Sequence, residues 1–153
     1  MKFIKFFAVI IISSITCLPA YSQEPNKVQT KSTPATGDLK VIMNGLLDDT
    51  KLLTEGIFLE DFAQIEQAAN NIANHPMIKM ESKKKILATL GEEMSLFKGF
   101  DAKVHNASLE IAKSATNKDL VSVVSIYYQM IDGCFSCHNK YKNKISKLLQ
   151  DNN

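Results

Sequence analysis

The chain has 153 residues, which suits one domain with one hydrophobic core. It carries 18 Lys, no Arg and 16 acidic residues, and this near balance of charge gives no indication of nucleic-acid binding. Without Arg, the chain also lacks bidentate guanidinium contacts to phosphate groups.

Residues 1–22 have the pattern of a secretory signal peptide. Two lysines precede an apolar run at 6–12, which is too short to remain as a transmembrane helix, and Ala20-Tyr21-Ser22 has the small-x-small character of a cleavage site. We therefore expect an exported, periplasmic protein with no membrane anchor after cleavage. Cleavage would remove Cys17 and leave two cysteines in the mature chain.

Residues 23–37 contain two prolines and almost no apolar side chains, which predicts a flexible linker. From Asp38 onward the apolar residues recur at intervals of three and four, the period of amphipathic helices. The expected elements are a first helix capped by Asp38 and ending at Gly56, a second from Phe58 to Asn74-His75-Pro76, a shorter stretch from Ser82 to Phe97, a third long helix from Phe100 to Ala115, and a last helix capped by Thr116 and Asn117 and running to Leu148.

The predicted fold class is all-α. Four long amphipathic helices with short connections predict an antiparallel up-and-down four-helix bundle over residues 38–150, with a polar tail at its end. No strand is expected.

The last helix carries Cys134-Phe135-Ser136-Cys137-His138, a C-x-x-C-H sequence, which is the attachment signature of a c-type haem. Two thiols three residues apart lie on one helical turn, so both can bond to vinyl groups at one edge of the porphyrin. His138 then lies under the iron, where its imidazole can be the proximal ligand. Export fits this chemistry, because c-type haem is attached outside the cytoplasmic membrane.

Two other kinds of site use closely spaced cysteines. A thioredoxin-like redox pair follows a strand in a βαβ unit, and no strand pattern precedes Cys134. A zinc site needs further ligands, but there is no second Cys pair, and His75 and His105 lack the usual paired spacing. The sequence therefore favours haem attachment.

In the order of these features the chain resembles the cytochrome c-prime family, secreted four-helix bundles with one C-x-x-C-H near the end of the fourth helix. The similarity covers about residues 38–142. Many members carry one Arg in the first helix and another soon after the haem histidine, where this chain has Lys40 and Lys142, so the resemblance does not identify the propionate partners. Besides the motif, the similarity includes Met43, the Ile72-Ala73-Asn74-His75-Pro76 helix ending, the Phe97-Lys98-Gly99-Phe100-Asp101 link, His105 and Tyr141.

The family divides by what occupies the other side of the iron. In its low-spin branch a Met of the first helix is the sixth ligand, whereas in its five-coordinate branch an apolar residue leaves that position open to small gases. Met43 lies on the expected inward row of the first helix, at a height that matches His138 if the helices rise about 1.5 Å per residue. The resemblance implies axial ligation by His138 and Met43, and the alternative is that Met43 only fills the core.

The predicted function is a soluble periplasmic electron carrier with one haem c, covalently held by Cys134 and Cys137 and ligated by His138 and Met43. The alternative is a five-coordinate haem protein that binds nitric oxide or carbon monoxide for sensing or detoxification. An enzyme is not expected, because no acid–base pair is predicted opposite the iron.

The expected partners are redox proteins. Lysines that follow His138 either compensate the negative end of the helix dipole or form a positive rim that steers an acidic partner. Family members are often dimers through the first two helices, and the charges of Asp48, Asp49, Glu60 and Asp61 leave a homodimer of this chain open. The lysines concerned are Lys140, Lys142, Lys144 and Lys147.

Overall fold

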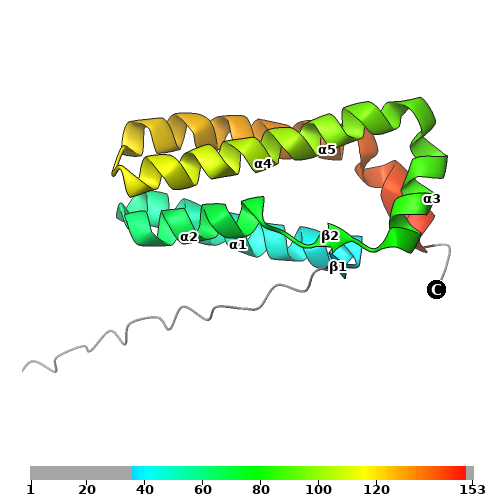
Figure 1. Ribbon diagram of the computed structural model, residues 1–153, viewed down its shortest axis with the longest axis horizontal. Helices are drawn as coiled ribbons and strands as arrows, with labels where there is room; N and C mark the ends of the chain where they lie inside the picture. The colour runs from blue at the N-terminus through cyan, green and yellow to red at the C-terminus, as the bar shows by residue number, and fades with distance from the viewer. Residues whose placement is uncertain (1–35, 151–153) are drawn as a thin grey trace, which may run out of the picture. The chain divides into compact units, whose positions relative to one another are not determined.

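The computed structural model describes residues 36–150, which are mainly helical and confirm the predicted all-α class (Figure 1). The predicted signal peptide 1–22, the predicted linker up to residue 35 and Cys17 lie outside the described residues. The elements are β1 (Thr36–Gly37), α1 (Leu39–Leu59), α2 (Phe62–Ala73), β2 (Met77–Ile78), α3 (Met80–Leu90), the 3-10 turn η1 (Gly91–Glu93), α4 (Met94–Thr116) and α5 (Leu120–Gln150).

A short parallel strand pair connects the start of the described chain to the segment after α2. Thr36 pairs with Met77 and Gly37 with Ile78, and the Lys79 N–H donates a 3.1 Å hydrogen bond to the Gly37 carbonyl. No strand was expected, and Thr36 and Gly37 were assigned to the linker. Strands of two residues show no periodicity in the sequence, so the pattern of apolar residues could not reveal them.

The turn between α1 and α2 differs from the prediction. Helix α1 passes through Gly56 and ends at Leu59, and Glu60 then takes a left-handed conformation with φ of 54°. The carboxylate of Asp61 accepts a 3.1 Å hydrogen bond from the backbone N–H of Gln64, which caps the start of α2. Gly56 therefore serves the packing of two helices and does not end the first one.

The region between α3 and α4 also differs from the prediction. Helix α3 begins at Met80, before the expected cap Ser82, and ends at Leu90. Gly91, with φ of 52°, and the η1 turn then separate α3 from α4, which already begins at Met94. The apolar residues keep the same period across this break, so the sequence pattern predicted one continuous helical stretch from Ser82 to Phe97.

At the other end of α4, Asp119 rather than Thr116 or Asn117 caps the last helix. Its carboxylate accepts hydrogen bonds from the backbone N–H of Ser122 at 3.0 Å and from the Ser122 hydroxyl at 2.6 Å. Thr116 belongs to α4, where its hydroxyl donates to the carbonyl of Ala112 at 3.0 Å.

The buried side chains form two clusters. The larger one joins α1, α2, α4 and α5, and the smaller one lies where α3 meets the end of α5 (Figure 1). Helix α4 packs along both α2 and α5, while α1 packs mainly against α2. The larger cluster is Leu53, Ile65, Ala68, Ala69, Ile72, Ala107, Ile111, Ala112, Ala115, Val123 and Met130, and the smaller is Ile86, Leu90, Tyr141 and Ile145.

Helices α1 and α5 are connected by a hydrogen bond between the hydroxyls of Thr54 and Tyr127, 2.8 Å apart.

Within the described part of the chain, α5 is the one helix long and apolar enough to cross a membrane, over Leu120–Leu148, by length and composition alone. One such helix is weak evidence, because a core helix of a soluble protein passes the same test. Here α5 contributes Val123 and Met130, both fully buried, to the larger cluster.

Candidate functional site

The C-x-x-C-H sequence lies within α5, as predicted. Cys134 and Cys137 are half-buried and one helical turn apart, so their thiols share one face of the helix, and His138 is exposed. Gly133, directly before them, is buried. A Cβ atom at that position would lie 3.0 Å from Cγ2 of Val104, so the glycine allows α4 to approach α5 at the start of the motif.

Neither thiol is in a disulfide, and both have a raised pKa. Burial raises the pKa of Cys134. The pKa of Cys137 is raised to about 11, chiefly by burial and further by the negative charge of Asp101. Redox-active cysteine pairs have the opposite property, since their reactivity depends on a lowered thiol pKa. The environment of these thiols therefore argues against thioredoxin-like chemistry.

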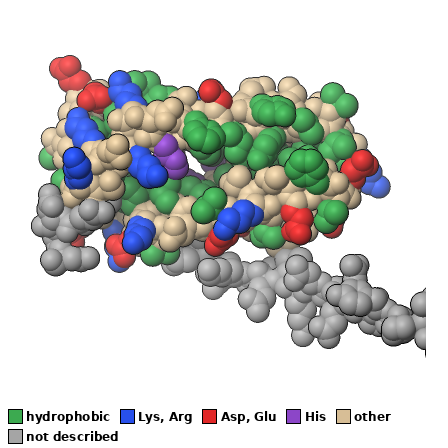
Figure 2. Space-filling model, turned by 180° about the vertical axis from the view of Figure 1, so that it is seen from behind, with side chains coloured by type: hydrophobic (Ala, Val, Ile, Leu, Met, Phe, Trp, Pro, Cys, Tyr) green, Lys and Arg blue, Asp and Glu red, His purple; other side chains and the backbone are tan. Residues whose placement is uncertain are grey.

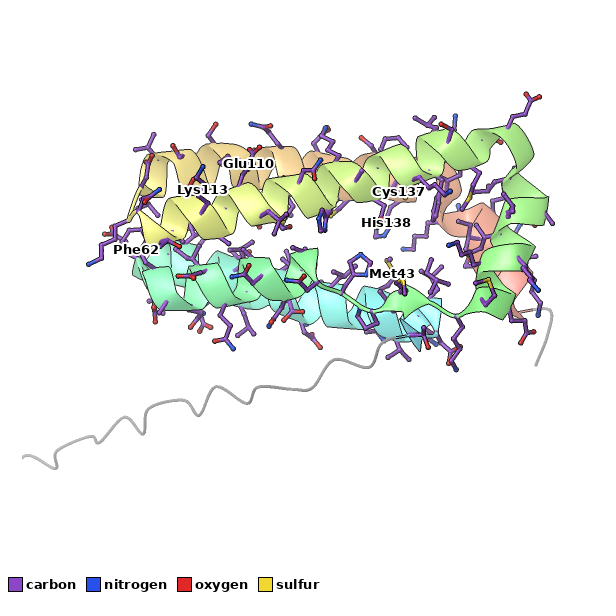
Figure 3. The ribbon with its side chains drawn as sticks, viewed as in Figure 1. Met43, Phe62, Glu110, Lys113, Cys137 and His138 are labelled. Atoms are coloured by element: carbon purple, nitrogen blue, oxygen red, sulfur yellow. The ribbon has the colours of Figure 1, made fainter. Side chains whose placement is uncertain are left out.

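Met43 lies on α1 opposite the motif, at the end of the helices where α3 packs (Figure 3). Leu39, one turn before it, packs against the same small cluster as Cys137, so the beginning of α1 and the end of α5 meet there. Met43 was expected on the buried row of α1, but Ile42 takes that place with 3% exposure and Met43 is 38% exposed. The Met43 side chain is thus not committed to core packing.

His138 makes no hydrogen bond or ion pair with any residue in the range 36–150. Figure 3 shows His138 between Cys137 on α5 and Met43 on α1. The structure brings the four predicted site residues to one end of the molecule.

One wall of this region is apolar and aromatic. Tyr141, one turn beyond Cys137, is 1% exposed and meets Phe97 and Phe100 edge to face, with ring centroids 5.5 Å and 6.2 Å away. Phe97, Phe100 and Cys137 all pack against the small cluster. Two other aromatic residues, Phe62 and Tyr127, pack against the larger cluster and are not part of this wall.

Two further histidines, His75 and His105, act electrostatically on Asp101, whose charge in turn acts on Cys137. The Nδ1 of His75 is 2.9 Å from the Pro76 carbonyl oxygen, and its Nε2 is 3.4 Å from Oδ1 of Asp101. The Nδ1 of His105 lies 2.9 Å from the Ala73 carbonyl oxygen. Asp101 and His105 lie one helical turn apart in the sequence, and this spacing is a signal from which part of the cluster could be predicted.

The lysines after His138 do not all play the same role. Lys144 and Lys140 lie 3.2 Å and 3.6 Å from the carboxylate of Glu93, which connects the end of α5 to the η1 turn. Lys142 and Lys147 are exposed and form no salt bridge with residues 36–150. Figure 2 shows basic side chains gathered at this end of the molecule, beside a histidine and a hollow in the surface.

Within residues 36–150, no three His, Cys, Asp or Glu side chains come together as they do in a protein-built metal site. Comparison of the chain with known protein families, with curated proteins and with solved structures finds no match in any of the three. The function therefore has to be argued from the residues described above.

Proposed function

We propose that this protein is an exported mono-haem c-type cytochrome that carries electrons. The observation that carries the proposal is the placement of the C-x-x-C-H sequence on α5 with Met43 facing it from α1 (Figure 3). We also propose that the helices form an antiparallel up-and-down bundle in which α1 and α5 flank the haem, as in the cytochrome c-prime family.

The donor set fits a covalently held haem. Cys134 and Cys137 provide two unpaired thiols on one helical turn, His138 provides an imidazole with no partner among the described residues, and Met43 provides a thioether. When bound, haem supplies a one-electron couple at its iron. Ligation by the Met43 sulfur would raise the reduction potential, because thioether ligation favours the ferrous state.

The protein around the motif would keep water from one side of the group. Tyr141, Phe97 and Phe100 form a packed aromatic wall beside Cys137. Apolar surroundings disfavour the extra positive charge of the oxidised state, which acts in the same direction as the thioether.

The decisive experiment is mass spectrometry of the exported protein, expressed with its first 22 residues in a host that attaches c-type haem. We expect the mass of one haem in addition to the mature polypeptide. The double variant Cys134→Ala, Cys137→Ala should lose this mass. Cys17→Ala is the matched control and should keep it, because this cysteine lies in the predicted signal peptide. A mature wild-type protein at its bare peptide mass would refute the proposal.

Carbon monoxide separates the electron carrier from the gas-binding alternative. With Met43 bound, the iron is low-spin in both oxidation states and the visible spectrum of the reduced protein does not change when carbon monoxide is added. A high-spin spectrum that shifts on addition of carbon monoxide would instead support a five-coordinate haem that binds nitric oxide or carbon monoxide.

A further inference from the structure

The described lysines without a salt bridge are concentrated at the end of the molecule that holds His138. Six exposed lysines lie there, on the first turn of α1, on α3, on the beginning of α4 and on the end of α5. Lys142 lies one helical turn beyond His138, on the same face of α5. The six are Lys40, Lys83, Lys84, Lys98, Lys142 and Lys147.

The carboxylates described at this end are almost all paired with a lysine or a histidine. Asp38 is bridged to Lys79 at 3.0 Å and Glu81 to Lys85 at 2.8 Å. Glu93 and Asp101 are bridged as described above, by two lysines and by His75. Glu92 is the one carboxylate here without a salt bridge in the described range, so this end carries a clear excess of positive charge.

The opposite end of the helices, where α1 turns into α2 and α4 into α5, has the reverse balance. Only Lys113 and Lys118 lie there without a salt bridge in residues 36–150. Six carboxylates at that end form no salt bridge with any described residue, namely Glu55, Glu60, Asp61, Glu66, Glu110 and Asp119.

This separation of charge is large on the scale of ionic screening. Helix α5 has 31 residues. At about 1.5 Å per residue it spans roughly 45 Å, while the Debye length at physiological salt is about 8 Å. A partner that approaches one end therefore meets the charge of that end alone. The predicted mature chain has almost no net charge, so this separation, rather than net charge, decides which end is attracted.

We propose that the lysine-rich end, defined by the six lysines above, is the docking surface for an acidic face of a redox partner protein. The proposal rests on the proposed electron-carrier function, because the same end holds His138 and Met43. Electrostatic steering would present this end first and place the redox centre nearest the partner, which raises the association rate more than the final affinity.

The test compares two charge reversals that change the net charge by the same amount at opposite ends. Lys98→Glu with Lys142→Glu alters the docking surface, and Lys113→Glu with Lys118→Glu is the matched control. Polyglutamate is the probe, titrated into the mature protein at low and high salt, with amide NMR shifts as the readout. We expect the first variant to weaken binding about tenfold at low salt, and the control by less than about twofold.

Shifts confined to the lysine-rich end that vanish at high salt would support the proposal. Equal weakening by both variants, or binding insensitive to salt, would overturn it. Tighter binding to phosphatidylglycerol vesicles than to polyglutamate would also overturn it and would point to a membrane surface. The titration needs no haem, so it stays interpretable if the mass measurement refutes the cytochrome assignment, and its failure leaves that assignment intact.

For the holoprotein, the rate of oxidation by hexacyanoferrate(III), a small anionic oxidant, provides a second readout. The Lys98→Glu, Lys142→Glu variant should react several times more slowly than the control variant at low salt, and the two rates should converge as salt increases. Rates that are equal at low salt would contradict the proposed docking surface.

Discussion

The imidazole of His75 lies between two hydrogen-bond acceptors, the carboxylate of Asp101 at 3.4 Å and the Pro76 carbonyl oxygen at 2.9 Å. A neutral imidazole has one N–H and can satisfy only one of them, whereas the imidazolium form donates to both. The pKa of His75 is accordingly raised, mainly by its hydrogen bond to Asp101 and against the opposing effect of burial. The pKa of Asp101 is lowered, mainly by the same hydrogen bond.

This ion pair predicts a pH window for stability. His75 has a folded-state pKa above its ordinary value of 6.5, so its contribution is complete below that pH and is lost as pH rises through the raised pKa. Asp101 has a folded-state pKa below its ordinary value of 3.8, so its contribution is lost as pH falls through the lowered pKa. The pair stabilises the fold most between about pH 4 and pH 6.5.

Replacing His75 by Gln should therefore lower the free energy of unfolding by about 0.5–1 kcal/mol near pH 5.5, a modest value because Asp101 is exposed. The difference from wild type should shrink above about pH 8. Urea unfolding at both pH values measures it. Asp101→Asn should cost a similar amount, and the double variant should cost little more, because both changes break one interaction. A difference that is constant with pH would show that His75 acts through packing alone.

Two glycines of α1 should respond oppositely to substitution by Ala. A Cβ at Gly56 would lie 3.0 Å from Cγ1 and 3.2 Å from the backbone nitrogen of Ile65, whereas a Cβ at Gly45 meets nothing within 4 Å. We expect Gly56→Ala to lower the free energy of unfolding by about 1–3 kcal/mol because α2 must move away. Gly45→Ala should raise it by about 0.5–1 kcal/mol through helix propensity. Stabilisation by both substitutions would mean that the contact between α1 and α2 is looser than described.

Gly56 also illustrates what the sequence could and could not predict. A glycine near the end of an apolar pattern was interpreted as a helix terminator, because that is the commonest local role of glycine. Its actual role depends on a contact with Ile65 of α2, which exists only because the chain turns back at Glu60. Helix content and the position of the motif on a helix followed from the three-and-four period and were predicted correctly. The start of α1 after Asp38 and the end of α2 at Asn74 were predicted too, whereas the helix ends set by Glu60, Gly91 and Asp119 were not.

The same division holds for the candidate site. Cys134, Cys137 and His138 could be proposed as a haem site from spacing alone, because the chemistry of haem attachment requires neighbouring positions in the sequence. His75 and Asp101 could not, since they come from different elements and meet only through tertiary packing. The burial of Ile42 in place of Met43 was missed for a related reason. A Cβ at Gly37 would lie 3.2 Å from Cγ1 of Ile42, so Ile42 packs under a strand that the sequence pattern did not reveal.

The aromatic wall behind the motif should be important for stability. Tyr141 is 1% exposed and packs against Phe97 and Phe100. Tyr141→Ala should lower the free energy of unfolding by about 3–4 kcal/mol. Tyr141→Phe should cost less than about 1 kcal/mol, because the hydroxyl makes only a long 3.4 Å hydrogen bond to the Glu93 carbonyl.

Tyr128, on the same helix, is the matched control for this loss, since it is 69% exposed. Its substitution by Ala should change the free energy of unfolding by less than about 1 kcal/mol. Urea unfolding of the three variants gives the comparison. Similar losses for Tyr128→Ala and Tyr141→Ala would contradict the burial described for Tyr141.

The proposed ligation by Met43 gives the most direct test of the site. Met43→Ala removes the thioether but little core packing, because the side chain is 38% exposed, so the variant should fold with a loss of about 1 kcal/mol or less. In the holoprotein, the low-spin spectrum should become high-spin, and the reduced form should then bind carbon monoxide. Met77→Ala is the control, since Met77 is 67% exposed and lies on β2, and it should leave the spectrum unchanged. If Met43→Ala keeps a low-spin spectrum, another group occupies the sixth position, and His105, half-buried on α4, is the next residue to substitute.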